Sequence, residues 1–160
     1  MAYVFKTEPF DHQRQVFERS KDLQYYALFL EMGTGKTKVT VDSIAYLYES
    51  GEIDTVLIIA PKGVYENWIK NEIPKHMPDR FEKFIVKWQP NFTKKFKTEL
   101  GEIATREKRK EDRLHILVMN VEALSTRKGL EVATYYLKQN PDNMIVVDES
   151  TTIKNKGAAR

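Results

Sequence analysis

The fold follows from one stretch, Leu28-Phe29-Leu30-Glu31-Met32-Gly33-Thr34-Gly35-Lys36-Thr37, in which an apolar run leads into a Gly-x-Gly-Lys-Thr loop. Glycines let the backbone curl so that successive N–H groups point at an anion. In such a loop the lysine reaches the terminal phosphates and the threonine hydroxyl ligates Mg²⁺, while the next helix adds the positive end of its dipole. The alternative interpretation is a glycine turn with a surface lysine. We expect phosphate contacts from Gly33, Thr34, Gly35, Lys36 and Thr37.

Composition sets broad limits on the function. The 160 residues are 41% hydrophobic and 31% charged, as in one globular domain, and no apolar run approaches the ~20 residues of a membrane span. A net charge of +3 permits a nucleic-acid partner without arguing for one. The absence of cysteine excludes disulfides and cysteine metal clusters and fits a reducing, cytoplasmic setting. Three scattered histidines argue against a histidine zinc site.

Short apolar runs predict the strands of a parallel sheet. The runs are continuous rather than alternating, which is typical of strands buried on both faces. They cover residues 27–30, 55–60, 115–119 and 144–147, with a weaker one at 84–88.

Helical periodicity lies between these runs. It predicts helices over 11–19, over 41–48 with a stop at Gly51, over 65–73 ended by Pro74, over 92–103 and over 130–137. Alternating strands and helices indicate right-handed crossovers and a three-layer α/β fold with a mostly parallel central sheet.

A second motif follows the last apolar run. Asp148 and Glu149 come directly after a buried strand, and the carboxyl ends of parallel strands are where such sheets place ligands. Asp148 suits Mg²⁺, through a water molecule, because this hard cation prefers oxygen ligands. Glu149 is placed to polarise an attacking water, so we expect Lys36, Asp148 and Glu149 to be the catalytic residues, with Thr37 and Asp148 at the metal. The alternative is an ordinary exposed acidic corner.

Taken in order, the motifs resemble the first RecA-like domain of superfamily 2 helicases and translocases, and most of all the SWI/SNF type and its phage relatives. Residues 9–13, Pro-Phe-Asp-His-Gln, resemble the adenine-sensing Q motif, which gives Gln13 the place that reads the base. Residues 31–37 correspond to motif I, and residues 148–155 resemble motif II. Residues 59–68, with Glu72 beyond them, resemble motif Ia, and the pair Asn67-Trp68 before that glutamate favours the SWI/SNF branch.

The resemblance implies ATP and Mg²⁺ as cofactors and DNA, double-stranded and read without sequence preference, as partner. It places DNA-backbone contacts at Pro61, Lys62 and Gly63 in motif Ia and at Asn120 in motif Ib. A solvated lysine with no ligand is the alternative for Lys62. We assign Trp68 to the core rather than to base stacking.

The sequence departs from the family pattern at several positions. Thr151 stands where motif II has histidine, Asn120 and Val121 replace the usual threonine and tyrosine of motif Ib, and Leu30 replaces a small residue before the phosphate loop. These changes affect the expected coupling between the ATP and DNA sites and the individual motif Ib contacts.

Residues 1–160 are expected to form one N-terminal RecA-like ATP-binding domain that stops before the motif III strand and lacks the second RecA-like domain with its arginine finger. We expect the intact protein to be a DNA-dependent ATPase that moves on DNA, and this chain alone to hydrolyse ATP slowly or not at all.

Two other hypotheses stay open: an unrelated P-loop NTPase or kinase, and a truncated module that binds nucleic acid or protein without turnover. Cytoplasmic location, with phage origin as one option, is expected. A missing motif III strand would leave unpaired strand edges, which predicts strand rearrangement or self-association.

Overall fold

A four-stranded, all-parallel sheet forms the centre of the protein, as seen in a computed structural model that describes residues 3–22, 35–104 and 112–148. The strand order is β2-β3-β1-β4, and every neighbouring pair is parallel. The bounds are Thr55–Ala60 for β1, Glu82–Lys87 for β2, Arg113–Asn120 for β3 and Asn143–Val147 for β4. The predicted parallel α/β architecture is confirmed, while the run at 27–30 lies outside the described residues.

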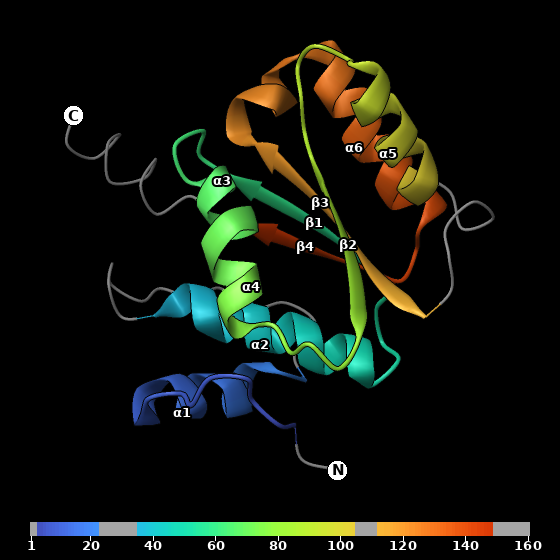
Figure 1. Ribbon diagram of the computed structural model, residues 1–160. Helices are drawn as coiled ribbons and strands as arrows, with labels where there is room; N and C mark the ends of the chain where they lie inside the picture. The colour runs from blue at the N-terminus through green and yellow to red at the C-terminus, as the bar shows by residue number, and fades with distance from the viewer. Residues whose placement is uncertain (1–2, 23–34, 105–111, 149–160) are drawn as a thin grey trace.

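Helices cover both faces of this sheet (Figure 1). One face carries α2 (Lys36–Glu49) and the consecutive segments α3 (Tyr65–Asn67), η1 (Trp68–Glu72) and α4 (Ile73–His76), with α1 (Asp11–Ser20) packed against α2. The opposite face carries α5 (Lys94–Ala104) and α6 (Arg127–Gln139), the latter preceded by the 3-10 turn η2 (Val121–Ser125). The three predicted layers are therefore present.

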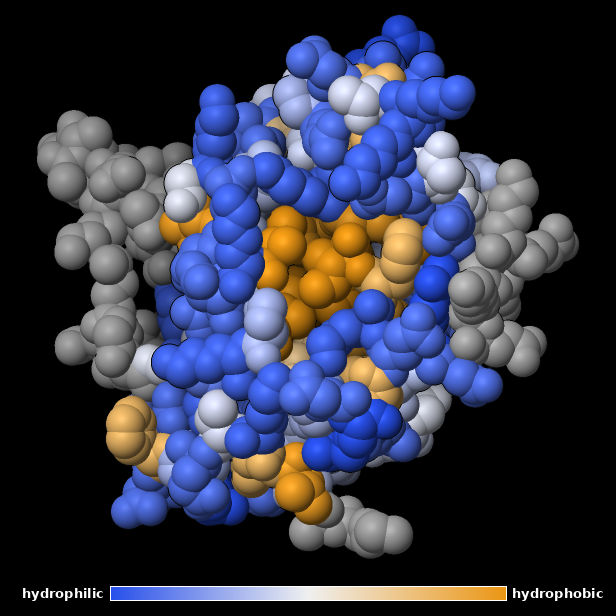
Figure 2. All heavy atoms as spheres, in the orientation of Figure 1, coloured by the Kyte–Doolittle hydropathy of each residue, from blue (hydrophilic) through white to orange (hydrophobic). Residues whose placement is uncertain are grey.

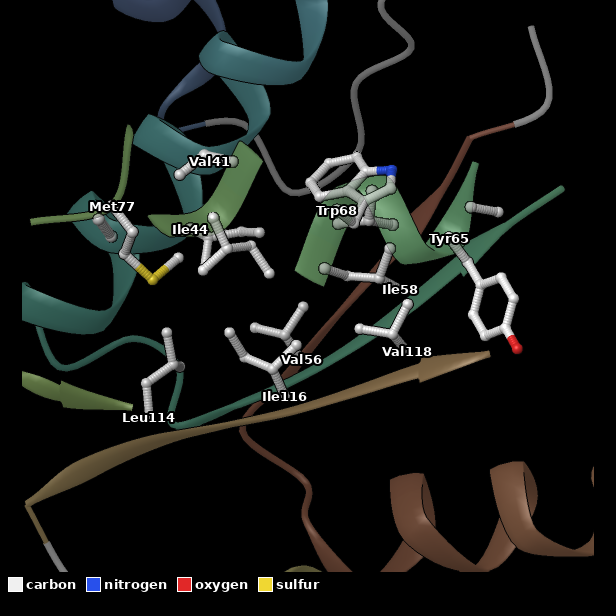
Figure 3. Packing of buried hydrophobic residues seen from close by; sticks show 14 of the residues in the cluster. Val41, Ile44, Val56, Ile58, Tyr65, Trp68, Met77, Leu114, Ile116 and Val118 are labelled. Carbon is white, nitrogen blue, oxygen red and sulfur yellow. The ribbon is translucent and has the colours of Figure 1, made fainter. Parts of the chain in front are cut away.

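Two hydrophobic cores lie on opposite sides of the sheet because successive residues of a strand point to opposite faces. Val56 and Ile58 of β1 join the core under α2, to which Trp68 also belongs (Figure 3). Leu57 and Ile59 join the core under α5 and α6. The hydroxyl of Tyr136, on α6, donates to the carbonyl oxygen of Val56 at 3.2 Å and ties that helix to β1.

The helix after β1 extends beyond its predicted end at Pro74. Residues Trp68–Glu72 form a π-helical turn in which the Ile73 N–H donates to the Trp68 carbonyl oxygen, five residues earlier. Pro74 lacks an N–H and its ring would clash with a carbonyl four residues back in a regular α-helix. The wider π turn precedes the proline, and the chain stays helical to His76.

Among the strands that the structure describes, β4 is an outer one, and it keeps apolar side chains at the surface. It pairs with β1 on one side, and Ile145 and Val147 are 51% and 52% exposed. Self-association through such an edge stays a prediction. In the view of Figure 2, hydrophilic residues surround a central apolar area that lies where Figure 1 shows the strands. Within the described part of the chain, no helix combines the length and hydropathy needed to span a membrane.

Candidate functional site

The carboxyl ends of three strands meet at one edge of the sheet. Ala60, the last residue of β1, is in register with Asn120 at the end of β3. On the other side of β1, Ile59 is in register with Val147, and the Asp148 N–H continues the ladder by donating to the Ile59 carbonyl oxygen at 2.7 Å. The residues that follow β1, β3 and β4 are thus brought together, as the sequence predicted.

The end of the Gly-x-Gly-Lys-Thr loop has the backbone geometry that a phosphate loop needs. Gly35 is the N-cap of α2, with φ of 79°, in the left-handed region that suits glycine. Lys36 and Thr37 form the first turn of α2, so the positive end of its dipole lies at the loop. Gly33 and Thr34 lie outside the described residues.

Lys36 and Asp148 connect the two predicted motifs. The Lys36 ammonium nitrogen lies 3.9 Å from Oδ1 of Asp148, although the residues are far apart in sequence. Both side chains are largely enclosed, with exposed fractions of 21% and 11%. A lysine and a carboxylate at this separation can share a phosphate and its divalent cation. Glu149 falls outside the described residues.

Gln13 reaches the phosphate loop from α1. Its Oε1 accepts a hydrogen bond from the Phe10 N–H at 2.7 Å, and its Nε2 donates to the Gly35 carbonyl oxygen at 3.3 Å. The side chain is buried, with 5% exposure. Contact between Gln13 and the loop was not predicted; base reading by Gln13 stays a prediction.

The predicted DNA contacts occupy the same sheet edge. Pro61, Lys62 and Gly63 form the turn between β1 and α3, in which Lys62 and Gly63 are exposed and the Val64 N–H donates to the Pro61 carbonyl oxygen. Asn120 is buried, and its Oδ1 accepts from the Ala123 N–H at 2.8 Å as the N-cap of η2. Asn120 therefore shapes the loop after β3, and its contact with DNA stays a prediction.

Sequence reasoning missed the role of the Trp68 indole. Trp68 is in the core, as expected, but its Nε1 also donates to Oδ2 of Asp148 at 3.2 Å. The signal that could have indicated this contact was the Asn67-Trp68 pair, which stands in the motif Ia segment directly after the β1 turn.

A buried polar network beside the site was also missed. Lys38, the residue after Thr37, donates to Oδ2 of Asp42 and to the Thr7 carbonyl oxygen, both at 2.8 Å. Burial raises the pKa of Asp42 to about 6, although the Lys38 charge acts in the opposite direction. Burial lowers the pKa of His76 to about 4, with a smaller contribution from the charge of Lys38.

The metal would be held by few protein ligands. Among residues 3–22, 35–104 and 112–148 no group of three or more histidine, cysteine or acidic side chains is clustered. The donors expected from the sequence are the Thr37 hydroxyl and the Asp148 carboxylate. Mg²⁺ is commonly bound by one or two oxygen ligands together with phosphates and water, so this donor set fits it.

Known proteins resemble this chain in sequence. It is 33% identical over 131 residues to the probable ATP-dependent DNA helicase CHR23 of Arabidopsis thaliana, covering 81% of this chain and 11% of that protein. It is 28% identical over 133 residues to the ATP-dependent helicase FUN30 of Saccharomyces cerevisiae, covering 81% of this chain and 10% of that protein. The chain thus spans about a tenth of the length of these relatives.

A solved structure shares the fold. The Sulfolobus solfataricus SWI2/SNF2 ATPase core in complex with dsDNA superposes with a TM-score of 0.57 and 17% sequence identity. The match covers 98% of this chain and 35% of that one. A family model described as the SNF2-related domain matches residues 20–160, and this chain belongs to the SNF2-related domain family.

Proposed function

We propose that this chain is the ATP-binding part of a DNA-dependent ATPase that couples hydrolysis to movement on DNA. The observation that carries the proposal is the 3.9 Å approach of Lys36 to Asp148 beside the left-handed Gly35. Membership of the SNF2-related domain family supports it. The relatives are named as ATP-dependent helicases, which supports the proposed use of ATP. The structural neighbour is an ATPase core in complex with dsDNA, which supports the proposed binding of DNA.

The residues of the loop and of β4 would share the work of holding the nucleotide. The Gly35 backbone and the first turn of α2 direct N–H groups at the phosphates, and Lys36 adds a cation. Thr37 and Asp148 would hold Mg²⁺, which when bound neutralises charge on the transferred phosphoryl group. Glu149 follows Asp148 directly in the sequence and is proposed to orient the attacking water.

We place DNA at the same sheet edge. Pro61, Lys62 and Gly63 form an exposed turn that can follow a phosphate backbone, and Asn120 ends the neighbouring strand. Such contacts position the protein without reading bases, which suits a translocating enzyme. A second RecA-like domain, supplying an arginine to the phosphates across the domain interface, and a cytoplasmic location are further parts of this proposal.

The test is ATP hydrolysis by the complete protein that carries this chain, measured with and without double-stranded DNA. We expect DNA to stimulate turnover and Lys36→Ala to abolish it. Lys95→Ala is the matched control, because this lysine on α5 is 84% exposed and lies outside the site. Turnover that ignores DNA would favour an unrelated P-loop NTPase, and absence of nucleotide binding would favour a module without turnover.

A further inference from the structure

Trp68 is in contact with the carboxylate that the proposed function assigns to Mg²⁺. Its indole Nε1 donates to Oδ2 of Asp148 at 3.2 Å, and the tryptophan is 2% exposed. An indole N–H is a donor only, and a buried one needs an acceptor. The hydrogen bond therefore satisfies the indole and fixes one oxygen of the carboxylate at once.

The rest of the Trp68 side chain is held by the core. It packs in the cluster that contains Ile58 and Val118, and in Figure 3 its ring lies over these residues while the nitrogen points away from them toward the end of β4. The π turn that begins at Trp68 contributes to this placement, because it keeps both Trp68 and Ile73 buried across a five-residue step. A ring locked in this way holds its hydrogen bond in one direction.

The two oxygens of Asp148 have different neighbours. Oδ1 lies 3.9 Å from the Lys36 ammonium group, whereas Oδ2 accepts from the neutral indole. Lys36 is also the lysine expected to pair with phosphates, so a bound nucleotide would compete with Asp148 for its ammonium group. The indole is neutral, so its hydrogen bond orients the carboxylate without neutralising the negative charge that attracts a cation.

We propose that Trp68 is a positioning residue, whose indole N–H holds the Asp148 carboxylate in the orientation that receives the divalent cation. The inference rests on the proposed function, which assigns Asp148 to Mg²⁺. Hydrogen bonds to metal-binding carboxylates orient them, and their loss weakens metal binding by about 10–100-fold. Trp68 would act on Mg²⁺ affinity without contacting nucleotide or metal.

The test measures the ADP affinity of the wild type and of Trp68→Phe by calorimetry at a series of Mg²⁺ concentrations. Phenylalanine keeps most of the apolar ring and removes the N–H. For Trp68→Phe we expect the Mg²⁺ concentration that gives half of the full increase in ADP affinity to rise about tenfold. Its ADP affinity in the presence of a chelator, without Mg²⁺, should equal that of the wild type. Trp88→Phe is the matched control: Trp88 is 3% exposed and packs with Phe92 and Phe96 in the other core, so its Mg²⁺ dependence should equal that of the wild type.

A second measurement applies if Trp68→Phe does not fold. The chain has two tryptophans, so Trp88→Phe leaves Trp68 as the single indole fluorophore. Its emission should change with Mg²⁺ and ADP together and not with ADP alone. Equal Mg²⁺ dependence in wild type and Trp68→Phe, or emission insensitive to Mg²⁺, would overturn the inference while leaving the nucleotide site intact. A wild type that binds no ADP at any Mg²⁺ concentration would overturn the proposed function itself.

Discussion

The side-chain amide of Gln13 lies against Gly35: Nε2 is 3.3 Å from the Gly35 carbonyl oxygen and only 1.9 Å from where a Cβ on that glycine would stand. Gly35 also has φ of 79°, so an alanine there would be strained as well as crowded. We predict that Gly35→Ala destabilises the chain by about 2–4 kcal/mol and lowers ATP affinity. Urea unfolding and calorimetry measure the two effects.

Gly51 supplies the matched control for this prediction. It has the same φ of 79° with no atom within 4 Å of a built Cβ, so Gly51→Ala adds strain without a clash. Its cost should be about 1 kcal/mol, with ATP affinity unchanged. In the Gln13→Ala background the clash is removed, so adding Gly35→Ala there should cost about as much as Gly51→Ala does in the wild type. An equal cost for both glycine variants would mean that the Gln13 side chain moves aside at little cost, and would contradict this prediction.

Lys36→Ala should weaken ATP and ADP binding by at least about tenfold, because it removes a charge-assisted contact to the phosphates. It also removes the cation beside Asp148, but folding stability should change little, because the 3.9 Å separation is too long for a hydrogen bond and the Trp68 N–H still donates to that carboxylate. Calorimetry with Lys70→Ala, a lysine that is 71% exposed, gives the control. Equal affinity in wild type and Lys36→Ala would place the nucleotide elsewhere.

Most of the architecture could be predicted from the sequence. Strands buried on both faces gave continuous apolar runs at β1 and β3, and β4 has such a run although Ile145 and Val147 are half exposed. All three elements lie within a few residues of their predicted bounds. The helix around Pro74 was predicted too short, because a periodic pattern contains no information on a π turn that makes room for the proline ring.

The site was only partly predictable for a physical reason. Motifs place residues at strand ends, so the approach of Lys36 to Asp148 followed from the pattern and the parallel sheet. Contacts made by tertiary packing carry no periodic signal. The bond from Trp68 to Asp148, and that from Gln13 to Gly35, join segments that the sequence shows as separate.

The exposed turn after β1 predicts a salt-dependent effect on DNA binding. Lys62→Ala should weaken binding to double-stranded DNA of any sequence to a similar extent, and reduce the slope of log affinity against log salt concentration by about 1. Fluorescence anisotropy at several salt concentrations measures both quantities. Lys95→Ala, on α5 away from this turn, should change neither. A sequence-dependent loss, or an unchanged slope, would argue against a phosphate contact at Lys62.

His76 and Asp42 face a shared network with opposite responses to pH. Nδ1 of His76 is 2.7 Å from the Thr7 hydroxyl, and Lys38 links the Thr7 carbonyl oxygen to Asp42. His76 has a folded pKa of about 4, below its ordinary 6.5, so the unfolded chain takes up this proton first and stability falls as pH drops from 6.5 to 4. Asp42 has a folded pKa of about 6, above its ordinary 3.8, so the folded chain takes up this proton first and stability rises over the same window.

The two contributions oppose each other in the wild type, and removing either one should expose the other. When the pH falls from 6.5 to 4.5, the unfolding free energy of His76→Gln should change by about 2 kcal/mol more favourably than that of the wild type. The reason is that the variant has no histidine whose protonation stabilises the unfolded chain. Asp42→Asn should lose about as much over the same interval. Urea unfolding of the three proteins at both pH values measures these changes, and comparison with wild type cancels the groups that all three share. If both variants showed the wild-type difference between the two pH values, neither buried group would titrate as its surroundings require.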